Sequence, residues 1–282
     1  MRKFLLVAML CPILTQAQWH VNVLGGFANY IGDLQEKGYT TQQSHGAFSL
    51  GLQYDLSPHF SILGNGSYGR VGASDAFSKQ ADLRARNLSF QSKIYEGNFL
   101  LEYNLLDLNE HRITPYVFAG GAIYHFNPYT YDSLGKKAYL RPLSTEGEGL
   151  SQYPNRKPYN LFQFAIPFGG GIKFRISDNI TLAYEIGLRK LFTDYLDDVS
   201  STYVDRATLL AAKGPEAVAL AYRGDEVKGG ATYPAAGSVR GGSKYKDWYY
   251  ISGIKLSIAL NTDKLSAHRR HNGVIDCPKK VY

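Results

Sequence analysis

Apolar side chains recur at every second position in eight segments of the chain. This two-residue period puts alternate side chains on opposite faces of a β-strand. The clearest case is residues 162–176, where Phe164, Ile166 and Phe168 alternate with smaller or polar neighbours, a pattern that does not suit a helix. The segments with this period are residues 19–29, 46–54, 60–71, 89–105, 116–126, 162–176, 180–189 and 248–260. We therefore expect eight strands, each with its apolar series of side chains toward lipid.

The connections between these segments alternate between short and long. The short ones lie near residues 55, 107 and 177, and the long ones are residues 31–45, 72–88, 127–160 and 192–246. Outer-membrane barrels have this asymmetry, with short periplasmic turns and long external loops. In the last long loop, Leu209–Ala212 and Ala217–Ala221 predict one or two short helices.

The first 17 residues have the features of a secretory signal peptide. A basic start, Met1-Arg2-Lys3, precedes an apolar run and a small residue, Ala17, so the mature chain is expected to begin at Gln18. Lipidation at Cys11 is the alternative, but Leu10 is bulky where a lipoprotein signal needs a small residue. After residue 17 no stretch approaches the ~20 apolar residues of a membrane helix. A chain that spans a membrane without such helices must do so as a closed barrel.

Composition agrees with short amphipathic strands. The chain has 22 Tyr, 29 Gly and 13% aromatic residues with a mean hydropathy of −0.25. The fold class expected is all-β: an eight-stranded antiparallel transmembrane β-barrel over residues 18–260, OmpA-like, with short periplasmic turns. The formal charge of +7 is spread along the chain without a basic stripe beside a recognition helix, so nucleic-acid binding is not indicated.

Charged residues occupy the polar faces of several predicted strands. A barrel of ~8 strands is just wide enough to be filled by its own side chains, so a wide pore is not expected. We interpret these charges as a plug of salt bridges, rather than as a proton or ion path, because charges removed from water need partners. The residues of this lumen charge network are Glu96, Glu102, Lys173, Arg175, Glu185, Arg189 and Lys255.

No catalytic, metal or cofactor motif is evident. The seven His residues are scattered without metal-ligand spacing, and no nucleophile context is recognisable. Asp194, Asp197 and Asp198 lack the alternating acceptors and glycine of a calcium loop, so a solvated loop face is the favoured interpretation. The glycine runs 169–171 and 229–230 lack the Lys-Ser/Thr ending of a phosphate loop. The sequence therefore predicts a protein that is not an enzyme and holds no cofactor.

The tail after residue 260 is basic and is expected in the periplasm. We hypothesise that it binds an acidic or cysteine-bearing partner, the alternative being a plain solvated tail. Cys277 is the only cysteine left after signal cleavage, so a disulfide through it would join another chain. The candidate partner-binding residues are Lys264, His268, Arg269, Arg270, His271, Cys277, Lys279 and Lys280.

Several segments resemble the PorG family of Bacteroidetes outer-membrane proteins associated with the type IX secretion system. They follow one another through nearly the whole mature chain: Tyr30–Leu34, Ala85–Phe90, Thr114–Gly120, Phe126–Pro128, Gln163–Gly171 and Phe192–Ser200. The resemblance implies a non-catalytic barrel that associates on its periplasmic side with a ring of PorK-like and PorN-like subunits, in protein secretion or gliding motility. It assigns no catalytic or ligand residues.

Two other functions remain open. The chain could be a passive OmpA-like structural or adhesive barrel that uses its external loops. An outer-membrane lipid-modifying enzyme is disfavoured, because catalytic groups are missing.

Overall fold

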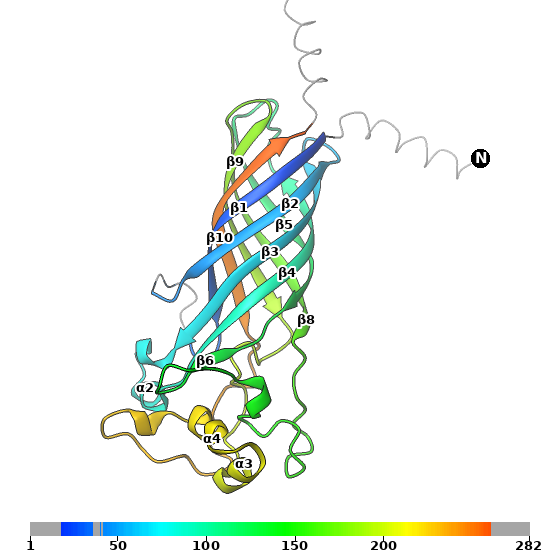
Figure 1. Ribbon diagram of the computed structural model, residues 1–282. Coiled ribbons are helices and arrows are strands. Elements are labelled where there is room, and N and C mark those ends of the chain that lie inside the picture. Colours follow the sequence, from blue (N-terminus) through cyan, green and yellow to red (C-terminus); the bar gives the residue numbers. More distant parts are fainter. Residues whose placement is uncertain (1–17, 36–39, 41, 261–282) are drawn as a thin grey trace, which may run out of the picture.

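The eight predicted strands close into one antiparallel barrel. The computed structural model describes residues 18–35, 40 and 42–260 (Figure 1). The bounds of the eight barrel strands differ from those of the predicted segments by at most three residues. The barrel strands are β1 Gln18–Ile31, β2 His45–Asp55, β3 Phe60–Ser74, β4 Ser89–Asn104, β5 Ile113–His125, β8 Phe162–Arg175, β9 Ile180–Leu191 and β10 Trp248–Ala259.

Each barrel strand pairs with its neighbours along the chain, and the first and last strands close the cylinder. β1 pairs antiparallel with β10 from His20↔Ala259 to Ile31↔Trp248. Closure removes the free sheet edges that a bilayer would leave without hydrogen-bond partners. No helix in the described part of the chain is long and apolar enough to cross a membrane.

The barrel exterior is apolar and is bounded by aromatic residues near both ends. Phe164 and Phe99 are 67% and 74% exposed, as lipid-facing side chains are. Tyrosine, tryptophan and phenylalanine gather at the two membrane interfaces of such barrels. The aromatic pairs are Trp19–Tyr54 and Phe60–Tyr103 at the short-turn end, and Tyr68–Tyr95 and Phe168–Trp248 at the long-loop end.

In β5 the side chains face opposite to our expectation. Tyr116 and Phe118 are buried inside the barrel, whereas Val117 and Ile123 are about half exposed on its outside. Both faces of this strand are apolar, so alternation alone does not say which meets lipid. The larger rings face inward, where they fill the lumen.

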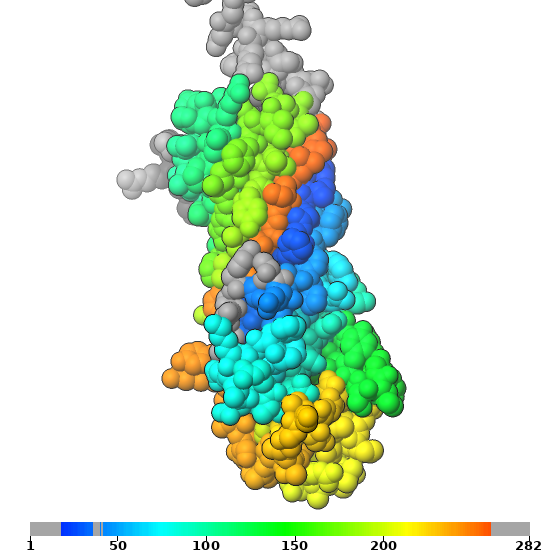
Figure 2. Space-filling view, turned by 90° about the vertical axis from the view of Figure 1, so that its left-hand side faces the viewer, coloured from blue at the N-terminus to red at the C-terminus, as the bar shows by residue number. Residues whose placement is uncertain are grey.

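The long connections fold into a compact cap beyond one end of the barrel. It contains η2 Asp75–Phe77, α2 Ala81–Arg86, β6 Tyr129–Tyr131, β7 Lys137–Tyr139, η3 Arg141–Leu143, α3 Arg206–Lys213, α4 Pro215–Ala221 and η4 Gly224–Glu226. Figure 2 shows the cyan, green and yellow-to-orange segments of three loops as one mass. The prediction of one or two short helices in the last long loop is confirmed: there are two, α3 and α4. Both described chain ends lie at the opposite, short-turn end (Figure 1).

Candidate functional site: the ion-paired lumen and the loop cap

The barrel interior carries two groups of ion pairs. Glu102, which is fully buried, accepts hydrogen bonds from Lys173 and from Lys255, whose Nζ lies 3.1 Å from Glu102 Oε2. Lys255 Nζ also lies 2.5 Å from Glu185 Oε2. Glu185 in turn accepts a hydrogen bond of 2.7 Å from the Tyr116 hydroxyl. Each lysine therefore has the partner that a buried charge requires.

The second group lies nearer the cap. Arg189 donates from Nε and Nη2 to the two oxygens of Glu96, at 3.0 and 3.1 Å. The Tyr249 hydroxyl also donates to Glu96. A two-point arginine–carboxylate contact of this kind fixes both side chains in one geometry.

Six of the seven residues expected in the lumen network belong to these two groups. Arg175 does not, because it lies at the end of β8, where its Nη2 is 3.5 Å from the Asn109 carbonyl of a short turn. The cavity beside the network, lined by residues such as Asn22, Ser67 and Asn98, has a volume of about 20 Å³. That is room for roughly one water molecule, so the lumen is filled at this level.

The cap has a hydrophobic core of its own. Val204 and Leu209 are fully buried and pack with Ala217, Val218 and Ala221 of α4. Asp205 begins α3 by accepting a hydrogen bond of 2.8 Å from the Thr208 N–H. A side-chain acceptor at this position satisfies one of the free N–H groups of a helix start.

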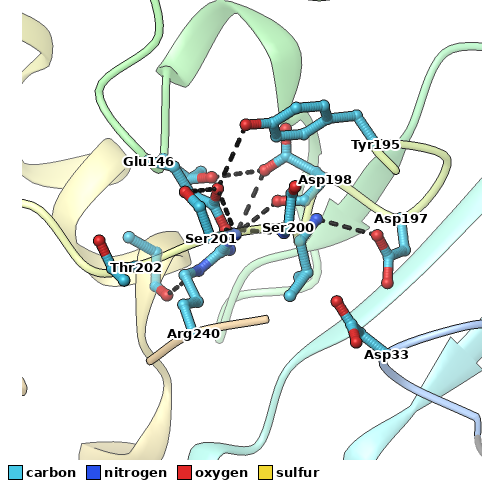
Figure 3. Close-up of polar contacts among 12 residues, drawn as sticks. Asp33, Glu146, Tyr195, Asp197, Asp198, Ser200, Ser201, Thr202 and Arg240 are labelled. Atoms are coloured by element: carbon cyan, nitrogen blue, oxygen red, sulfur yellow. Dashed lines mark hydrogen bonds and ion pairs between the residues drawn. The ribbon is translucent and has the colours of Figure 1, made fainter. Parts of the chain in front are cut away.

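Two buried arginines join the loops. Arg240 donates to Glu146 Oε1 at 3.0 Å and to the Asp198 and Ala221 carbonyls at 2.6 and 3.1 Å (Figure 3). Arg86 donates to both oxygens of Asp75 at 2.8 Å and to the Arg240 carbonyl. Residues from three loops thus meet around two guanidinium groups.

Glu146 is the main acceptor at this junction. Its carboxylate accepts from the N–H groups of Ser200 and Ser201, at 2.9 Å each, and from the Ser201 hydroxyl. Tyr195 approaches the same carboxylate from the opposite side (Figure 3). The acceptor therefore fixes the backbone of the 192–247 loop against the 126–161 loop.

The acidic residues of the last loop are buried, which contradicts our expectation of a solvated face. Asp194, Asp197 and Asp198 are 1–2% exposed. The expectation failed because the loops pack on one another, and loop sequence carries no periodic signal of such packing. Asp198 accepts from the Tyr159 hydroxyl at 2.7 Å and from Thr145 at 2.6 Å.

The buried carboxyls of the cap outnumber its buried cations, and burial raises the pKa of several of them. The Tyr30 oxygen lies 2.5 Å from Asp197 Oδ2 and 3.1 Å from Asp247 Oδ1, but a phenol has one proton to donate. One of these two contacts therefore needs a proton on the carboxyl. Burial, followed by the charge of Asp247, raises the pKa of Asp197 well above its usual value.

Glu148 is another buried carboxyl of the cap with a raised pKa. Burial, then the charges of Asp198 and Glu146, raise the pKa of Glu148 to about 8. Its Oε1 is buried without a hydrogen-bond partner among the described residues, while Oε2 accepts from the Glu146 N–H at 3.2 Å. Burial also raises the pKa of Asp198 to about 6, although Arg240 lowers it. Within residues 18–35, 40 and 42–260, no His, Cys, Asp and Glu side chains are grouped to hold a metal ion.

The candidate partner-binding residues all lie outside the described residues: Lys264, His268, Arg269, Arg270, His271, Cys277, Lys279 and Lys280. Sequence reasoning did not find the group of buried charged residues at which the loops of the cap meet. Its members Arg86, Glu146 and Arg240 are separated by more than 50 residues from one another, so no spacing links them.

A closed cylinder of eight antiparallel strands, apolar outside and ion-paired inside, defines an outer-membrane β-barrel. The chain belongs to the family described as "Domain of unknown function (DUF6089)", whose model matches residues 2–209. No curated protein sequence matched the chain.

Solved structures of outer-membrane barrels are similar at low identity. Ail, the attachment invasion locus protein of Yersinia pestis, is 10% identical with a TM-score of 0.39, covering 86% of this chain and 100% of Ail. OprG from Pseudomonas aeruginosa is 9% identical with a TM-score of 0.42, covering 86% and 96%. Neisserial surface protein A is 8% identical with a TM-score of 0.42, covering 86% and 97%.

Proposed function

We propose that the chain is a non-catalytic outer-membrane anchor that docks a PorK-like and PorN-like periplasmic ring of the type IX secretion system. The observation that carries the proposal is the filled, ion-paired lumen. Glu102 with its two lysines and Glu96 with Arg189 occupy the space that a conduit would need. A barrel without a conduit acts through its ends, which favours an attachment role over transport.

The short-turn end is the proposed docking end. The Leu260 N–H donates to the Trp19 carbonyl at 2.8 Å, so the last described residue lies beside the first strand at this end. With the short turns in the periplasm, the basic residues from Lys264 to Lys280 would meet an acidic surface of the ring. Cys277 would form the disulfide with a partner chain.

The test is crosslinking in intact cells from a photoreactive residue at Arg270, followed by identification of the captured protein. The proposal expects a ring-forming lipoprotein. The matched control carries the photoreactive residue at Leu134, which is 90% exposed on the cap. The absence of any crosslinked partner from position Arg270 would contradict the proposal. For the disulfide, Cys277→Ser should abolish a mobility shift on non-reducing gels, and a wild type without any shift would rule it out.

A second candidate is a passive structural or adhesive barrel. The cap favours it, because its own hydrophobic core and buried arginines give a folded surface at the long-loop end. Under this candidate, Leu134→Ser and similar changes on the cap surface would impair the cellular role, whereas removal of residues 262–282 would not. The docking proposal predicts the reverse.

A further inference from the structure

The outward face of the barrel strands is charged at one end only. On the outward-facing positions of the eight described strands the Lys and Arg residues are Arg70, Lys93 and Lys190, and no Asp or Glu occurs there. All three cations lie toward the long-loop end of their strands. A lipid-facing surface with cations and no acids at one rim favours contact with anions at that rim.

Two of these cations lie directly opposite each other. Arg70 on β3 and Lys93 on β4 are register partners, and both are exposed. Like charges at opposed positions of a strand pair destabilise it unless something compensates. Neither side chain forms an ion pair within the part of the chain that the structure describes.

Their position along the strands is that of lipid headgroups. The preceding outward pair is Tyr68 and Tyr95, also register partners, with ring centroids 5.2 Å apart. Tyrosine pairs at this place mark the boundary between hydrocarbon and headgroups. Two residues further along a strand is about 7 Å, which places Arg70 and Lys93 at the phosphate level.

A cleft lies directly beyond the two cations. Gly72 and Gln91, the next outward pair after Arg70 and Lys93, line a cavity of about 170 Å³. Its wall includes Ser74, Ser89 and Thr130 together with the aromatic residues Phe77, Phe90 and Tyr131. Hydroxyl and amide groups suit the sugar or polar part of a headgroup, and Tyr129 donates to Gln91 at 3.0 Å, which orients this amide.

We propose that Arg70 and Lys93 bind a phosphate group of an outer-leaflet lipid, with the headgroup in the cleft lined by Gly72 and Gln91. A lipid, rather than free phosphate, is the ligand because the same strands continue into the apolar exterior at Tyr68, Tyr95 and Phe99. Acyl chains would lie along those side chains. The inference is independent of the proposed secretion role.

The test measures binding of diphosphoryl lipid A to the detergent-solubilised full chain by native mass spectrometry. Arg70→Gln with Lys93→Gln should weaken binding about 25-fold, since each of the two cations at the bound phosphate contributes a factor of about five. The matched control is Lys190→Gln, an outward cation on β9 that does not line the cleft, which should stay within about twofold of wild type. The charge-conserving exchange Arg70→Lys with Lys93→Arg should restore most of the binding.

Three outcomes would overturn the proposal. One is equal binding of lipid A by the double glutamine variant and by Lys190→Gln. Another is equal binding of lipid A from which both phosphates have been removed. The third is inorganic phosphate binding as tightly as lipid A, which would assign a free-anion site. If the double variant fails to fold, the single variants Arg70→Gln and Lys93→Gln should each weaken binding about fivefold, and no loss in either contradicts the proposal.

Discussion

The lumen and the cap both bury charged groups, but they balance them differently. In the lumen, three carboxylates face three cations: Glu96, Glu102 and Glu185 with Arg189, Lys173 and Lys255. In the cap, buried acids outnumber buried arginines. They are Asp75, Glu146, Glu148, Asp194, Asp197, Asp198 and Asp247, against Arg86 and Arg240.

This difference separates two ways of burying charge. The lumen pairs each of its carboxylates with a cation, whereas in the described part of the cap burial and neighbouring acids raise the pKa of several carboxyls. The cap should therefore respond to pH in a range where the lumen network has no need to change. We therefore expect the lumen network and the cap to have separate stabilities.

The largest effect is expected in the lumen, for Glu102→Gln. The change leaves Lys173 without its carboxylate and Lys255 with Glu185 only, and breaking a buried pair costs about 4 kcal/mol. Urea unfolding in lipid vesicles measures this loss. Arg175→Gln, outside the network, is the matched control and should change stability by less than about 0.5 kcal/mol. Equal losses for the two variants would contradict the paired lumen.

A smaller effect, about 3 kcal/mol and confined to the cap, is expected for Arg240→Met. The loss is smaller because the Ser200 and Ser201 N–H groups still donate to the Glu146 carboxylate when its cation is removed. Limited proteolysis should cut the 192–247 loop faster while the barrel keeps its heat-dependent migration on gels. Arg223→Met is the control, because Arg223 pairs with Glu226 near the surface. Loss of the folded barrel in Arg240→Met would show that cap and lumen are one unit.

The pH response of the cap sharpens the comparison further. The pKa of about 8 for Glu148 in the folded state lies above its unfolded value near 4.3. Its contribution to stability is therefore complete below pH ~4 and is lost as pH rises through about 8. Glu148→Gln should flatten this dependence.

Hydrogen exchange of α3 and α4 between pH 6 and 9 provides the measurement, with β4 amides as the internal reference. Protection of the helices that falls with pH equally in wild type and Glu148→Gln would exclude Glu148 as the cause.

The barrel could be predicted from sequence far better than the cap. Alternation, as in Phe162–Phe168, depends on neighbouring residues, so strands and short turns follow directly from it. The face of β5 that meets lipid could not be predicted in this way, because Tyr116 and Val117, on opposite faces, are both apolar. The burial of Asp197 and the contact of Arg86 with the Arg240 carbonyl depend on loops distant in sequence, which single-chain patterns do not encode.

Conductance across a planar lipid bilayer tests the central claim most directly, namely that paired side chains fill the lumen. Wild-type protein, with insertion verified by its heat-dependent gel migration, should give no stable ion-conducting steps. Reproducible steps that scale with the amount of inserted protein would contradict a filled barrel, and with it the role of an anchor without a conduit.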